Sequence, residues 1–73
     1  MNNTPLVSSR RTINFIARTD KALEVAMELG GQSMTDTINR AVLAYAWMLT
    51  EMDSGADVQV AEPDGSVNSV KFL

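Results

Sequence analysis

The chain has 73 residues, of which 45% are apolar, and it carries six basic against nine acidic side chains, a formal net charge of −3. This length allows one small domain, which on its own buries only about 60% of the surface of its unfolded chain. Because the sequence contains no cysteine and no histidine, neither a disulfide nor a Cys/His metal site can stabilise it, and self-association is the remaining means of building a core.

The sequence shows no targeting or membrane signal. Its first eleven residues lack the apolar region of a secretory signal peptide. The longest apolar run, Ala41 to Leu49, has nine residues, whereas a helix needs about 20 to cross a bilayer. We therefore expect a cytoplasmic protein without a membrane span.

The charges are divided unevenly along the chain. Residues 1–21 hold four basic side chains and one acidic, a net of +3, whereas residues 22–73 hold two basic and eight acidic, a net of −6. The average charge argues against a nucleic-acid partner, because phosphate binding depends on lysine and arginine. The basic N-terminal part is nevertheless compatible with a nucleic-acid partner.

The N-terminal part predicts a flexible arm followed by one short strand. Residues 1–9 are rich in Asn, Thr, Pro and Ser and show no periodicity, which is typical of an arm. Residues 10–16 alternate polar and apolar side chains, as a half-buried strand does. Ile13 and Phe15 form the apolar face. The polar face holds Thr12 and Asn14.

A first helix is expected from about Arg18 to Leu29. Apolar residues recur here every three or four positions, and Gly30 and Gly31 follow as a stop signal. The apolar stripe consists of Ala22, Leu23, Ala26, Met27 and Leu29.

A second helix is expected to begin after Ser33 and to end near Asp53. The Ser33 hydroxyl can accept a hydrogen bond from an amide of the first turn, and Asp36 stands three residues on, as in a capping box. The apolar stripe consists of Met34, Ile38, Ala41, Val42, Tyr45, Leu49 and Met52. Further apolar side chains lie partly outside the stripe, so we expect a second subunit to cover them. These are Leu43, Ala44, Trp47 and Met48.

The C-terminal part predicts a linker, Ser54-Gly55-Ala56, and then a β-hairpin. In the turn sequence Glu62-Pro63-Asp64-Gly65, the proline fixes φ and the glycine can take the positive φ that a type I turn with a bulge requires. The flanking apolar residues are Val58 and Val60 before the turn and Val70 and Phe72 after it. Two isolated strands are marginal in water, so the hairpin is expected to pack on the helical core or to extend a sheet.

The lone N-terminal strand calls for a second copy of the chain, because a single strand leaves its backbone unpaired and its apolar face uncovered. Two chains that pair these strands antiparallel form a two-stranded ribbon packed on four helices. The polar side chains of both strands, with Arg10 beside them, then face outward in a shape that fits a DNA major groove.

These features resemble the ribbon-helix-helix (MetJ/Arc/CopG-like) family of DNA-binding proteins. The resemblance covers residues 10 to about 52 and is carried by two stretches, Arg11-Thr12-Ile13-Asn14-Phe15 and Gly31-Gln32-Ser33-Met34-Thr35-Asp36-Thr37-Ile38-Asn39-Arg40-Ala41. It implies a mainly α fold with short β structure: residues 10–53 form a dimeric domain with an intermolecular antiparallel ribbon and four helices. Residues 54–73 add the linker and the hairpin.

The resemblance also implies which residues meet DNA. The expected base contacts are Arg10, Thr12 and Asn14. The expected phosphate contacts are Arg11, Ser33, Met34 and Thr35. A helix N-terminus favours a phosphate independently of any family. The simpler alternatives are a solvent-facing strand edge for the polar strand residues, a solubilising arm for the arginines, and helix capping alone for Ser33 and Asp36.

The sequence thus predicts a homodimeric, sequence-specific DNA-binding transcriptional regulator of repressor type, without a metal or cofactor. One alternative is an antitoxin-like or other interaction module whose hairpin binds a partner protein by strand addition. Another is a dimeric scaffold that keeps the fold but does not bind DNA. No enzymatic activity is expected, because the chain lacks His, Cys, a Gly-rich phosphate loop and a serine with an evident base.

Overall fold

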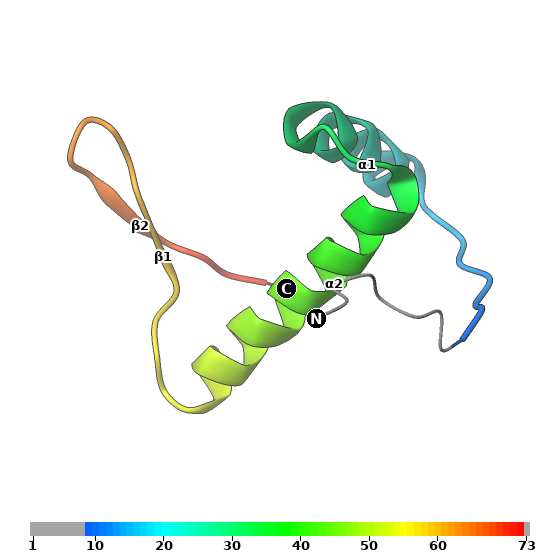
Figure 1. Cartoon of the computed structure of the whole chain (residues 1–73). Coiled ribbons are helices and arrows are strands. Elements are labelled where there is room, and N and C mark those ends of the chain that lie inside the picture. The colour runs from blue at the N-terminus through cyan, green and yellow to red at the C-terminus, as the bar shows by residue number, and fades with distance from the viewer. Residues whose placement is uncertain (1–8, 73) are drawn as a thin grey trace, which may run out of the picture.

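The computed structural model describes residues 9–72, which form two helices followed by a two-stranded antiparallel sheet (Figure 1). The elements are α1 (Ala17–Gly30), α2 (Met34–Asp53), β1 (Gln59–Ala61) and β2 (Val67–Ser69). The described chain is therefore mainly helical, and neither helix combines the length and apolarity that a membrane span requires. Apart from Ser9, the predicted N-terminal arm lies outside the described residues.

Local capping sets the limits of both helices, as the sequence predicts. Gly31 has φ +65° and donates its backbone N–H to the Met27 carbonyl at 2.9 Å, a left-handed C-cap that glycine adopts without strain. At the start of α2, Ser33 Oγ accepts a hydrogen bond from the Asp36 amide at 3.2 Å. The expected helix limits agree with the structure to within about one residue.

The N-terminal segment, residues 9–16, has no regular secondary structure in the single chain, so the predicted strand is not found there. The physical reason is the lack of a neighbouring strand. No backbone group of residues 10–15 forms a hydrogen bond with the backbone of another described residue. A strand is defined by pairing with a second strand, and one chain does not provide it.

The hairpin turn confirms the predicted turn chemistry. Gly65 has φ +92° and donates its amide to the Glu62 carbonyl at 3.0 Å, while the Glu62 amide donates to the Ser66 carbonyl at 2.7 Å. This is a tight turn followed by a residue in the left-handed region. Asp64 Oδ1 accepts from both the amide and the hydroxyl of Ser66, at 2.9 and 2.7 Å. These hydrogen bonds lower the pKa of Asp64.

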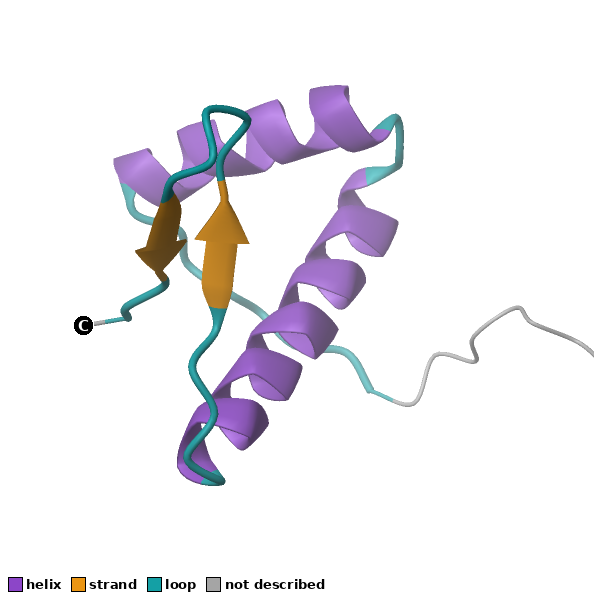
Figure 2. Cartoon of the chain, turned by 90° about the vertical axis from the view of Figure 1, so that its left-hand side faces the viewer, coloured by secondary structure: helices purple, strands orange, loops and turns teal. Residues whose placement is uncertain are grey.

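The helices and the hairpin are arranged around an open angle. Figure 2 shows α1 and α2 as two arms joined by a short turn, with the hairpin standing beside them. The turn contains Gly31, the C-cap residue of α1. The helices pack on each other, but neither strand packs on a helix. The hairpin reaches the helices through Phe72, which follows β2 and packs edge-to-face on Tyr45 of α2, with the ring centroids 4.8 Å apart. The expectation that the hairpin packs on the helical core is therefore met only by this contact beyond the end of β2, and not by the strands themselves.

The single chain has no hydrophobic core, because no described apolar side chain is buried. A compact body formed by residues 9–72 would expose about 4000 Å², and the nine residues outside that range would add at most about 1400 Å². The chain exposes 6909 Å², about 1500 Å² more than both contributions together. A stable fold therefore requires a further surface to cover these side chains. The most exposed of them are Leu29, Leu43, Ile16, Val42 and Trp47.

Candidate nucleic-acid interface

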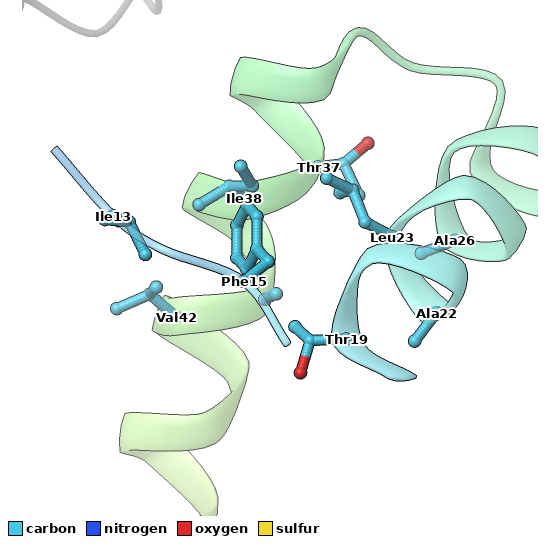
Figure 3. A pocket seen from close by; sticks show the side chains of 10 residues that line it. Ile13, Phe15, Thr19, Ala22, Leu23, Ala26, Thr37, Ile38 and Val42 are labelled. Carbon is cyan, nitrogen blue, oxygen red and sulfur yellow. The ribbon is translucent and has the colours of Figure 1, made fainter. Parts of the chain in front are cut away.

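The N-terminal segment keeps the alternation of a strand although it is unpaired. Ile13 and Phe15 line an open apolar cleft of about 430 Å³ that the segment forms with α1 and α2, and Figure 3 shows Phe15 beside Ile38. The remaining lining residues are Thr19, Ala22, Leu23 and Ala26 of α1 and Thr37, Ala41 and Val42 of α2. Thr12 and Asn14 do not line the cleft and are exposed, as expected for alternate residues of an extended chain.

The basic side chains surround this segment. Arg10 and Arg11 belong to it, and Arg18 and Lys21 follow in the first turns of α1; all four are exposed. The Arg11 side chain does not line the cleft, although its odd position in the alternation places it on the same side as Ile13 and Phe15. Its exposure leaves its charge available to an anionic partner.

The start of α2 offers hydrogen-bond donors to an anion. In a helix that begins at Met34, the amides of Met34 and Thr35 have no intrahelical acceptor. The third amide, that of Asp36, is satisfied by Ser33 Oγ, whose own proton is free to be donated. The positive end of the helix dipole also attracts an anion, whereas the Asp36 carboxylate in the same turn repels it. The net attraction for a phosphate is therefore modest for one helix.

The predicted base contacts and the predicted phosphate contacts both lie near the first half of α2. Ile38 and Val42 lie one to two turns after Ser33 and border the cleft that receives Phe15. The N-terminal segment consequently runs beside the first half of α2. The candidate base contacts lie on this segment, and the candidate phosphate contacts lie at the start of the helix. Both sets are exposed.

Thr37 is a feature that the sequence reasoning missed. It is the most buried described residue, 8% exposed, and its Oγ1 has no hydrogen-bond partner among the described residues. It lies on α2 where the helix faces Leu23 and Ala26 of α1 (Figure 3). A sequence signal exists, since Thr37 stands three residues after Met34 and four before Ala41, in the middle of the apolar stripe.

The described part of the chain offers few other features that could form a metal site or a reactive site. No group of three or more acidic side chains is placed there to hold a metal ion. Asp64, on the hairpin turn, is the titratable group with a clear pKa shift among the described residues. The N-terminal segment therefore combines exposed hydrogen-bond donors with basic side chains, and the start of α2 adds further exposed donors.

Comparison of the chain with known protein families, with curated proteins and with solved structures finds no match.

Proposed function

We propose that the protein is a homodimeric, sequence-specific DNA-binding regulator of the ribbon-helix-helix type. Two copies pair residues 10–16 into an antiparallel ribbon, and the ribbon enters the major groove of duplex DNA. The observation that carries the proposal is the state of this segment: its apolar side chains lie in the cleft, its polar side chains are exposed, and its backbone is unpaired.

The dimer is supported by what the single chain leaves unsatisfied. Pairing the N-terminal segments would give partners to backbone groups that have none in one chain. A two-fold axis brings the same surface of both copies together, so each segment pairs with its counterpart. The same contact would close the cleft over Phe15 and extend the cover over α2, whose Val42 is 62% exposed in the single chain.

DNA is supported as the partner by the chemistry of the exposed face. Arginine reads guanine and asparagine reads adenine through paired hydrogen bonds in the major groove. The threonine hydroxyl can donate a hydrogen bond to a base or accept one from it. Arg10, Asn14 and Thr12 supply these three groups. The first 21 residues of two copies bring a net charge of +6 to this region, from +3 in each chain. The acidic side chains follow later in the chain, and charges farther than about 10 Å are largely screened at ~0.1 M salt.

The N-terminus of α2 is proposed to hold a phosphate on each side of the ribbon. Its two free amides and the Ser33 hydroxyl supply donors, and the helix dipole supplies the sign of the field. These contacts orient the dimer on the duplex, whereas base contacts supply the sequence preference. A cytoplasmic location, as expected from the sequence, is part of the proposal.

The test is a selection from a pool of random duplexes at low salt, followed by fluorescence anisotropy with the selected sequence. Arg10→Ala and Asn14→Ala are each expected to weaken binding about 30-fold or more, because a base contact contributes about 1–3 kcal/mol and each substitution removes it from both copies. The dimer should persist in both variants. The control is Lys71→Ala, which removes the same charge from the hairpin and is expected to change the Kd less than about threefold. A dimer that binds no duplex at low salt, or equal losses for Arg10→Ala and Lys71→Ala, refutes the proposal.

A further inference from the structure

We infer that the C-terminal hairpin is a dimerisation arm, whose apolar face packs on α2 of a second copy of this chain. The inference rests on the proposed homodimer. It goes beyond that proposal because a ribbon and four helices form a dimer without any hairpin. It assigns Val58, Val60 and Val70 of the hairpin, with Phe72 after it, to the interface between the copies.

The hairpin has two chemically different faces. The register pairs Val60 with Asn68 and Gln59 with Ser69, so alternate residues lie on opposite faces. One face carries Val58, Val60 and Val70, and the first and last of these are half-buried. The residues of the other face are all exposed: Gln59, Ala61, Val67 and Ser69.

Side-chain hydrogen bonds hold the polar face in place. Asp57 Oδ2 accepts from Gln59 Nε2 at 2.7 Å and from Ser69 Oγ at 2.9 Å. The second of these bonds joins the approach to β1 with β2. This face is thus internally satisfied and suited to solvent, whereas the valine face has no polar group to satisfy apart from Asn68.

The valine face is turned toward α2 but is not covered by it. Phe72 continues the alternation of the valines and packs on Tyr45, which fixes the side that faces the helix. Neither strand packs on a helix, and Val60 remains 47% exposed. The exposed side chain of Val60 therefore has no helix packed on it within one chain.

The surface of α2 on this side is apolar along its whole length and only partly covered. Ile38, Val42, Tyr45 and Leu49 follow one another on successive turns. Phe15 covers part of the first half and Phe72 the middle, yet Val42 and Leu49 are 62% and 42% exposed. The N-terminal segment and this stripe of α2 border the apolar cleft, and the hairpin meets the same stripe through the contact of Phe72 with Tyr45.

A second copy is the occupant that fits this region. Without cover the chain has no core, so the cover must be present whenever the chain is folded, and another copy is the partner that is always available. The excess surface of about 1500 Å² for the whole chain gives about 3000 Å² for two chains, and the ribbon and the hairpin contact together would bury an area within the roughly 2000–5000 Å² of permanent homodimers. A two-fold axis would place the hairpin of each copy on α2 of the other.

The first test compares two valines of the same hairpin. Val60→Asp changes the apolar face and Val67→Asp the opposite face; their exposures are similar, 47% and 54%, and the added charge is the same. In sedimentation equilibrium, Val60→Asp is expected to raise the dimer dissociation constant at least tenfold, and Val67→Asp less than threefold. Val60→Thr and Val67→Thr, which preserve strand propensity and size, should show the same order with smaller changes.

Equal effects of the two aspartate variants, or no effect of either in a protein that is dimeric, overturn the hairpin inference and leave the proposed dimer intact. A wild-type chain that sediments as a monomer overturns both. The two failures are therefore distinguishable in one series of measurements.

The second test shows whether the contact joins two chains. A mixture of isotope-labelled and unlabelled chains is refolded together, and isotope-filtered nuclear Overhauser spectra are recorded. Cross-peaks are expected between the Val60 methyl groups of one copy and apolar or aromatic protons of α2 in the other. Val60 cross-peaks confined to protons of the same chain overturn the inference.

Discussion

Ser33 allows helix capping and phosphate binding to be separated by two substitutions at one position. Its Oγ accepts from the Asp36 amide at 3.2 Å. Ser33→Ala removes this acceptor and is expected to cost about 1 kcal/mol of unfolding free energy per chain. For a chain of this length, a loss of 1 kcal/mol lowers the Tm by roughly 4–8 °C. Ser33→Asp keeps a good capping acceptor, so its Tm should stay close to that of the wild type in thermal unfolding followed by circular dichroism.

In contrast to the Tm, the affinity for DNA should fall in Ser33→Asp. An aspartate at position 33 places a negative charge where the proposed phosphate lies. At a separation of about 4 Å in water, this repulsion is about 1 kcal/mol for each copy, or about 2 kcal/mol for a dimer, which corresponds to a roughly 30-fold rise in Kd. Fluorescence anisotropy at ~0.1 M salt measures it, at protein concentrations where both variants are folded. Wild-type affinity in Ser33→Asp would refute the phosphate contact, and an unchanged Tm in Ser33→Ala would refute the capping argument.

Two further predictions concern stability. Gly30→Ala should raise the Tm by a few degrees, because alanine is favoured over glycine in a helix and the added Cβ meets only Gln32 Oε1, at 4.0 Å. Gly31→Ala should lower the free energy of unfolding by about 1 kcal/mol, because φ is +65° at this position. Equal Tm changes in the two variants would contradict this reasoning. The lowered pKa of Asp64, caused by the Ser66 hydroxyl and amide, means that its stabilising contribution is complete above the ordinary aspartate pKa of about 3.9 and is lost as the pH falls through the lower folded value. An NMR titration of the Ser66 amide should show this midpoint below 3.9 in wild type and no such transition in Asp64→Asn.

The elements that the sequence predicts well are those with local causes. The helix limits follow from Ser33 and Gly31, and the hairpin turn follows from Pro63 and Gly65, each of which acts within a few residues of its own position. The alternation of residues 12–15 likewise correctly places Ile13 and Phe15 against the helices. These features need no knowledge of distant parts of the chain.

The remaining features depend on distant partners. The contact between Tyr45 and Phe72 joins α2 to the end of the chain, and no local pattern specifies this pairing. The N-terminal strand requires a neighbouring strand that one chain does not supply, so the ribbon stays a prediction. The burial of the Thr37 hydroxyl was not predicted. Its neighbours in the sequence show that it lies in an apolar stripe, but they do not show which other helix covers it.

For the proposed dimer, the lack of a core among the described residues of one chain has a consequence for how its concentration responds to synthesis. When folding requires association, the folded fraction follows mass action and rises with total concentration. Dilution, as during cell growth without new synthesis, shifts such a chain toward an unfolded form that proteases degrade. Synthesis must then exceed a threshold before folded protein accumulates, so a small change in expression yields a larger change in its concentration.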